Sequence, residues 1–120
     1  MPLVRIDMHR RHAERRPEIS SAIHRALIDG WGIPADDLFQ MFRLHEDGDL
    51  VFSRTYPDAD RSDILFVQIL AYGGASPEAK QKGATLIADN LASIGIPRDE
   101  MLIAISENGD GDWLAPKAEA

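Results

Sequence analysis

Four short apolar stretches punctuate the chain, and each has the length and composition of a β-strand. Leu3–Met8 is the first, and the nearly continuous run Ile64–Tyr72 predicts a central strand. Leu38–Leu44 alternates imperfectly between apolar and polar residues, and Met101–Ile105 is the last strong strand. A further short strand is predicted at Leu50–Ser53, after a segment with turn chemistry.

Two segments between these strands carry apolar residues at helical spacing. Pro17 suits the first turn of a helix, and either Gly30 or Gly32 is expected to end it. The second helix is expected to begin at Ser76-Pro77-Glu78, with serine as the cap and proline in the first turn. The positions that predict the two helices are Ile19, Ile23, Ala26, Leu27 and Trp31, and then Leu86, Ile87, Leu91 and Ile94.

The chain also repeats itself at an offset of 63 residues, since Gly32–Leu38 is echoed by Gly95–Met101. The same shift carries the strand Leu3–His9 onto Phe66–Tyr72. Each half therefore reads as strand, helix, Gly-Ile-Pro turn and strand. We predict one domain over 1–120 that contains pseudo-repeats at about 1–50 and 64–113.

Two tandem βαβ units predict an α+β fold, a four-stranded mixed sheet with both helices on one face, because parallel crossovers are right-handed. The other face then needs a cover, since apolar strand residues cannot all point towards two helices, and this predicts a closed oligomer. The residues that carry this argument are Phe39, Met41, Val67, Ile69, Leu102 and Ala104.

A ferredoxin-like βαββαβ module is the alternative fold. The first strand would lie parallel to the second in a tandem βαβ fold, and parallel to the third in the alternative.

The composition narrows the class of protein. The chain has 120 residues, of which 44% are hydrophobic and 28% are charged, as in globular domains. A net charge of -7 disfavours binding to nucleic acid. No apolar run is long enough to span a membrane and no signal peptide is evident, so a cytoplasmic location is expected. The absence of cysteine fits that compartment.

The start of the chain offers a candidate catalyst. A chain that begins Met1-Pro2 is expected to lose the methionine, which leaves the Pro2 nitrogen as a secondary amine. Burial of a cationic amine lowers its pKa towards neutrality, where a group serves well as a general acid or base. Because many proteins begin with this pair, the rest of the chain has to support the interpretation.

Five motifs together resemble the tautomerase superfamily, and most closely its malonate semialdehyde decarboxylase branch. They run from one end of the chain to the other. They are Pro2–Asp7, Pro34–Gln40, Arg61–Asp63, Ser76–Lys82, and Glu107-Asn108 through Asp112-Trp113.

The resemblance implies a homotrimer with active sites near the subunit interfaces. It also implies action on a small keto or semialdehyde acid without metal or organic cofactor. By position, Pro2 matches the catalytic amine of the family, Asp37 matches the aspartate that assists it, and Trp113 matches an aromatic residue near the pocket.

Two departures from the family pattern bear on the substrate. The branch carries arginine before Ser-Pro-Glu, where it holds the substrate carboxylate, but this segment is Gly73–Ser76 and has none. The aromatic, glycine-rich stretch that follows the tryptophan in the family is also missing after Trp113. Arg54 and Arg61 flank the central loop and are candidates for a substitute charge.

Two classes of function stay open at this point. The first is a cofactor-free enzyme that tautomerises, decarboxylates or hydrates a small acid through Pro2. The second is a non-catalytic ligand-binding or scaffold protein on the same fold. No metal site is expected, because no pair of histidines shows ligand spacing with an acidic or cysteine partner.

Overall fold

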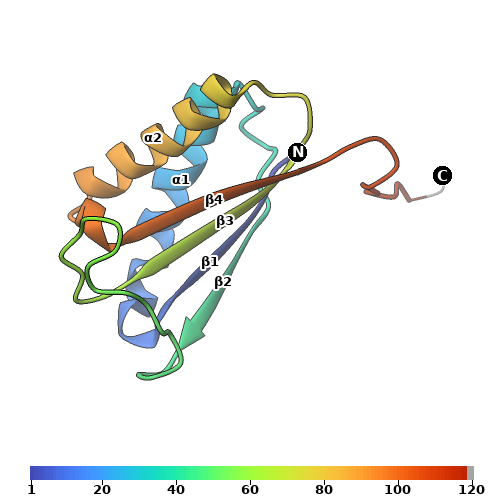
Figure 1. Cartoon of the computed structure of the whole chain (residues 1–120). Coiled ribbons are helices and arrows are strands. Elements are labelled where there is room, and N and C mark those ends of the chain that lie inside the picture. Colours follow the sequence, from blue (N-terminus) through green and yellow to red (C-terminus); the bar gives the residue numbers. More distant parts are fainter. Residues whose placement is uncertain (119–120) are drawn as a thin grey trace.

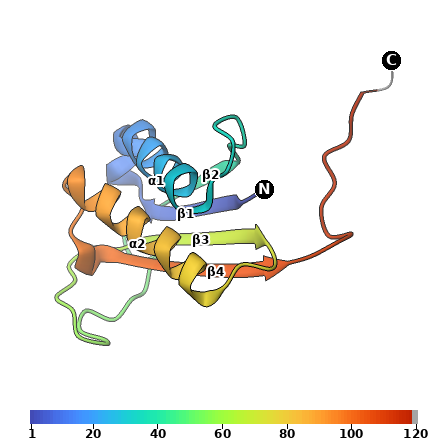
Figure 2. The ribbon, with the colours of Figure 1, turned by 90° about the horizontal axis from the view of Figure 1, so that it is seen from above.

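The computed structural model describes residues 1–118, which fold into a sheet and two helices. Both helices lie on one face of the sheet, as Figures 1 and 2 show. The first half holds β1 (Leu3–His9), the 3₁₀ helix η1 (Arg10–Arg15), α1 (Arg16–Trp31) and β2 (Gln40–His45). The second half holds β3 (Leu65–Tyr72), α2 (Pro77–Ser93), the 3₁₀ helix η2 (Arg98–Glu100) and β4 (Met101–Asn108).

The order of the strands decides between the two candidate folds. The sheet has the order β2-β1-β3-β4. β1 pairs in parallel with β2, and β3 pairs in parallel with β4. The two halves meet where β1 and β3 pair antiparallel. This confirms the two tandem βαβ units and the mixed sheet, and it contradicts the ferredoxin-like alternative.

The helix boundaries follow the predicted chemistry. Gly32 ends α1, with a φ of 69° and its N–H bonded to the carbonyl of Ile28. Ser76 caps α2, because its hydroxyl accepts a hydrogen bond from the N–H of Ala79 at 3.1 Å. Neither helix in residues 1–118 is long and apolar enough to cross a membrane.

The core lies between the sheet and the helices. Alternate residues of β1 and β3 point into it, and Ile6 and Val67 are fully buried there against Ile23 and Ile87. Burying each such side chain stabilises the fold by roughly 1.5–3 kcal/mol. The six apolar strand residues were not expected all to face the helices, and Val67 and Ile69 are the two that are buried in this core.

The opposite face of the sheet stays open, as expected from the remaining residues. Met41 on β2 is 41% exposed and Leu102 on β4 is 52% exposed. No other part of the described chain covers this face, which lies away from the helices in Figure 1. A shallow hollow on it is lined by Leu3, Arg5, Met41, Gln68, Ile69, Leu70, Ala104 and Ser106.

The prediction of a short strand at Leu50–Ser53 was wrong, because this segment is irregular. A strand needs a hydrogen-bonded neighbour. Val51 is 88% exposed, and within residues 1–118 the segment pairs with no strand. The whole connection from β2 to β3 is therefore a loop, and near its end Asp63 lies beside η1.

Candidate active site

The amino terminus lies beside Asp37. The α-amino nitrogen of Met1 is 3.4 Å from Oδ2 of Asp37, whose side chain is only 17% exposed. The second carboxylate oxygen, Oδ1, is buried and has no hydrogen-bond partner among the described residues. Pro2, the next residue inward, is buried. Buried polar atoms are normally paired, so an unpaired carboxylate oxygen beside an amine marks a candidate functional site.

The sheet topology produces this juxtaposition. β1 and β2 are parallel neighbours, so the start of β1 lies next to the segment that leads into β2. The N–H of Val4 donates to the carbonyl of Phe39 at 3.0 Å and fixes that register. Two residues earlier, the N–H of Asp37 donates to the carbonyl of Pro34 at 3.0 Å. This turn presents the aspartate to the chain terminus.

Pro2 borders a cavity of about 320 Å³ at this end of the sheet. Its aromatic walls are Trp31 and Tyr72, which come from the end of α1 and the end of β3. Trp31 is held in place, because its Nε1 donates to the carbonyl of Ala79 at 2.9 Å. The complete lining is Met1, Pro2, Gly30, Trp31, Ile33, Ala71, Tyr72, Gly73, Ala75 and Ala79.

Trp31 is a site residue that sequence reasoning missed, because its helical spacing assigned it to the core. The sequence did contain one indication of its position, a glycine within the predicted second helix. A Cβ at Gly83 would lie 2.3 Å from Nε1 of Trp31, so only glycine lets the indole pack against α2. A glycine in the middle of a helix costs about 1 kcal/mol relative to alanine, and close packing is a common reason for one.

A family comparison now adds to this geometry. A sequence model described as "Tautomerase enzyme" matches residues 37–114, which is more than half of the chain. The chain belongs to the tautomerase enzyme family. The match begins at Asp37, so the N-terminal strand lies outside it.

Individual relatives of this tautomerase cover nearly all of its length. The structure of FG41 malonate semialdehyde decarboxylase inhibited by 3-bromopropiolate is 31% identical, with a TM-score of 0.90 over 98% of this chain and 91% of that one. Probable tautomerase YusQ of Bacillus subtilis (strain 168) is 26% identical, over 94% of this chain and 91% of its own. A fused 4-OT shares the fold, with a TM-score of 0.79 at 12% identity over 98% and 94% of the two chains.

The resemblance to the decarboxylase branch is thus confirmed, but the structure does not bring all the candidate residues together. Trp113 follows β4, which ends at the same edge of the sheet as β3. It does not line the Pro2 cavity, and its Nε1 bonds to Oδ1 of Asn108 at 2.5 Å. The segment after β4 projects away from the sheet in Figure 2.

Arg54 and Arg61 lie at the other end of the sheet, next to the start of β3. Because β1 spans seven residues, this end is about 20 Å from Pro2 in the same chain. Both side chains are used inside the loop. Arg61 donates through Nη1 to the carbonyls of Ser53 and Tyr56, and Arg54 donates to the carbonyl of Arg61. Within one chain these arginines fix the loop.

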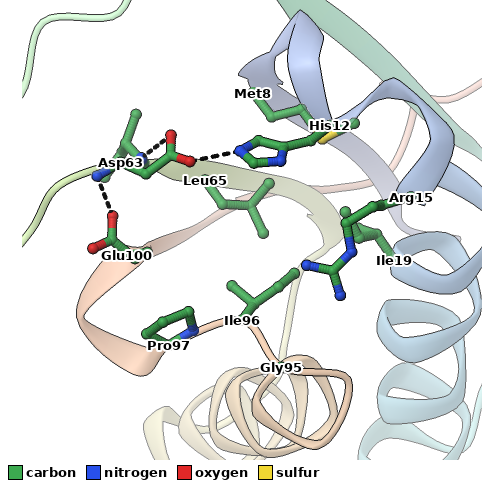
Figure 3. A pocket seen from close by; sticks show the side chains of 11 residues that line it. Met8, His12, Arg15, Ile19, Asp63, Leu65, Gly95, Ile96, Pro97 and Glu100 are labelled. Atoms are coloured by element: carbon green, nitrogen blue, oxygen red, sulfur yellow. Dashed lines mark hydrogen bonds and ion pairs between the residues drawn. The ribbon is translucent and has the colours of Figure 1, made fainter.

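A second cavity, of about 220 Å³, lies at this far end between η1 and the turn after α2. Figure 3 shows His12 pointing towards Asp63 across its mouth, with Nε2 2.5 Å from Oδ2. Arg15 reaches the end of α2, where Nη2 donates to the carbonyl of Ile94 at 2.5 Å. Glu100 accepts hydrogen bonds from the N–H groups of Ser62 and Asp63. Most polar groups here form hydrogen bonds with one another. We call this cluster a structural junction, because it joins η1, the loop before β3 and the turn after α2.

Asp63 is the centre of this junction. Burial opposes its charged form, but hydrogen bonds from His12, the N–H of Ile64 and His9 outweigh burial, and nearby Arg11 adds to them. Together they lower the pKa of Asp63 from 3.8 to about 2. Nδ1 of His9 lies 2.6 Å from Oδ1. Although histidines and a carboxylate meet here, residues 1–118 contain no group of three such side chains suited to holding a metal ion.

We expect Asp63→Asn to destabilise the fold in a pH-dependent way. The pKa of Asp63 is lower in the folded chain than in the unfolded chain, so its contribution is complete above pH 4 and is lost as pH falls towards 2. The shift corresponds to about 2 kcal/mol at neutral pH. Urea unfolding from pH 7 to pH 2 measures this at a fixed protein concentration.

The matched control is Asp58→Asn, an exposed aspartate of the same loop. It should leave the free energy of unfolding within about 0.5 kcal/mol of the original at every pH. An Asp63→Asn chain that is as stable as the control at pH 7 would contradict the assignment.

Proposed function

We propose that the chain without Met1 is a cofactor-independent tautomerase that uses the Pro2 nitrogen as its acid and base. The observation that carries the proposal is the amino terminus, which lies at a cavity and beside the mostly buried carboxylate of Asp37, one of whose oxygens is unpaired. Membership of the tautomerase family supports the same reaction class. The substrate is a small molecule that interconverts between keto and enol forms.

The proposed reaction moves one proton. The neutral Pro2 amine removes a proton from the carbon beside the substrate carbonyl, and the electron pair of that C–H bond moves onto the carbonyl oxygen. The protonated amine then delivers the proton to this oxygen and is restored as the base. The negative carboxylate of Asp37 stabilises the cationic amine between the two steps. The buried position of Pro2 holds the nitrogen still and limits access of water.

Decarboxylation is a weaker candidate than tautomerisation. It needs a group that holds the substrate carboxylate, and the cavity wall at Gly73 and Ala75 offers no side chain for this. Arg54 and Arg61 would have to come from a neighbouring subunit, and both are engaged in their own loop. We therefore propose that decarboxylation of malonate semialdehyde is slow compared with keto–enol exchange.

Proton exchange in heavy water tests the reaction class. Enzyme is mixed with small ketones, aldehydes and keto acids in D₂O, and loss of the α-proton signal is followed by NMR. The proposal expects exchange faster than in buffer for at least one of these compounds. Exchange at the buffer rate throughout would favour the non-catalytic alternative.

We also propose that the chain works as a homotrimer. The support is the open sheet face, where Met41 and Leu102 are exposed. A fused 4-OT with the same fold is described as a symmetric trimer. Sedimentation equilibrium at micromolar concentration should give three times the mass of one chain. Leu102→Glu should dissociate the assembly, while Val51→Glu in the loop after β2 should not; a stable monomer before substitution would contradict the proposal.

A further inference from the structure

Resting on the function proposed above, we infer that the Pro2 cavity selects an uncharged carbonyl compound and that Glu107 excludes carboxylate-bearing substrates from it. The class of substrate is an aldehyde, a ketone or a keto ester.

The cavity walls are apolar or aromatic. Among the described residues that line it, none carries a charged side chain. The charged partner nearest to the amine is Asp37, which is itself negative. A substrate carboxylate would thus leave water for a site with no cationic side chain in its walls, and burial of an unpaired charge is strongly unfavourable.

The loop behind the wall does contain the elements of an anion site. Lys80 lies in the first turns of α2, and the N–H of Gly74 points out of the loop that joins β3 to α2. An ammonium group and a free backbone N–H are suitable partners for a carboxylate. If Lys80 and the N–H of Gly74 had no other partner, a substrate carboxylate at this loop could accept hydrogen bonds from both.

Glu107 already occupies both of these donors. Its Oε1 lies 2.6 Å from Nζ of Lys80, and its Oε2 accepts the N–H of Gly74 at 3.2 Å. The hydrogen bond from Lys80 is the main cause that lowers the pKa of Glu107, so this side chain is anionic at neutral pH. A carboxylate supplied by the protein thus takes the place that a substrate carboxylate would need, and its charge repels a second one.

Glu107 is placed there by the sheet. It faces Ala71 across the β3–β4 pair, two residues before the cavity-lining Gly73. A Cβ built on Gly73 would lie 3.3 Å from Oε2 of Glu107, so the carboxylate is directly behind the cavity wall. Glu107 therefore adds a negative charge behind the wall of a cavity whose amine already has Asp37 as a neighbour.

A matched pair of substrates tests the inference. Phenylpyruvate and its methyl ester share the same reacting carbon and differ in the charge of the carboxyl group and by one methyl group. We expect kcat/KM for α-proton exchange to be at least tenfold higher for the ester, relative to the uncatalysed rate of each. A higher value for phenylpyruvate would overturn the inference, even if Pro2 is confirmed as the base.

The variant Glu107→Gln should release Lys80 and raise kcat/KM for phenylpyruvate roughly tenfold, which narrows the ratio of ester to acid. Asp89→Asn is the control, because Asp89 forms a similar exposed ion pair with Arg98 at the far end of α2. An unchanged ratio of ester to acid in Glu107→Gln would assign Glu107 a purely structural role and overturn the inference.

Binding gives a readout that does not depend on turnover. Calorimetry with phenylacetate and methyl phenylacetate compares the same two charges on compounds that are not turned over by keto–enol exchange. The ester should bind more tightly to the original chain, and Glu107→Gln should narrow the difference. If exchange activity is absent but this order of binding holds, the proposed function fails and the charge selection stands; equal or reversed affinities refute the selection.

Discussion

Acylation of the Pro2 nitrogen is expected to lower kcat for α-proton exchange by about 10²–10⁴-fold, the range typical of a general acid–base group. An acylated proline nitrogen is an amide and can neither accept nor return a proton at neutral pH. Among the described residues that line the cavity, none has a side-chain amine that could replace the Pro2 nitrogen. The measurement is NMR exchange on protein whose modification is confirmed by peptide mass.

The control for this experiment is selective modification of the terminal amine. The α-amine, with a pKa near 8, reacts at lower pH than lysine side chains, whose pKa is near 10.4, so acylation near neutral pH modifies Pro2 first. Peptide mass should show that Lys80, Lys82 and Lys117 are unmodified in the protein that is assayed. Full activity after acylation of Pro2 would remove it from the mechanism.

Asp37→Asn is expected to lower kcat by roughly 10²-fold with little change in KM. The carboxylate lies beside the terminal amine and stabilises its protonated form, which is the intermediate between the two proton transfers. The variant should also move the pH–rate profile to lower pH, because the amine then loses its proton more readily. Steady-state exchange rates between pH 5 and 9 give both quantities.

The neighbouring Asp36 supplies the matched control, since it is exposed and lies one residue earlier in the same turn. Asp36→Asn should reproduce the original kcat and pH–rate profile. If Asp37→Asn lowers kcat but does not shift the pH–rate profile, the aspartate only maintains the turn and does not act on the amine.

The sequence predicted most of the fold because its signals are local and repeated. The 63-residue offset placed both βαβ units, and Ser76 and Gly32 marked helix boundaries through their own capping chemistry. The strand at Leu50–Ser53 failed because apolar composition does not reveal whether a pairing partner exists. The sequence did not show that Val67 and Ile69 face the helices, because nearly every residue of the run Ile64–Tyr72 is apolar. Such a run does not show which residues point to which face of the sheet.

The site was harder to predict than the fold. The resemblance to the family led to Pro2 and Asp37, and the structure then put the chain terminus and this aspartate together. Arg54 and Arg61 were chosen for their charge and for their place at the ends of the central loop, and strand direction puts them at the opposite end of the sheet. Trp31 and Glu107 were missed, because their importance depends on contacts with Gly83 and Lys80 in other elements. Such pairings are set by tertiary packing.

The most direct test of the central claim compares two forms of this chain that differ only at residue 1. One form retains Met1, and the other is produced from it by a methionine aminopeptidase, with intact mass confirming each. The Pro2 mechanism predicts rapid α-proton exchange by the form that begins at Pro2, and a rate at least 10²-fold lower by the form with Met1, whose Pro2 nitrogen is an amide. Equal exchange rates for the two forms would contradict it.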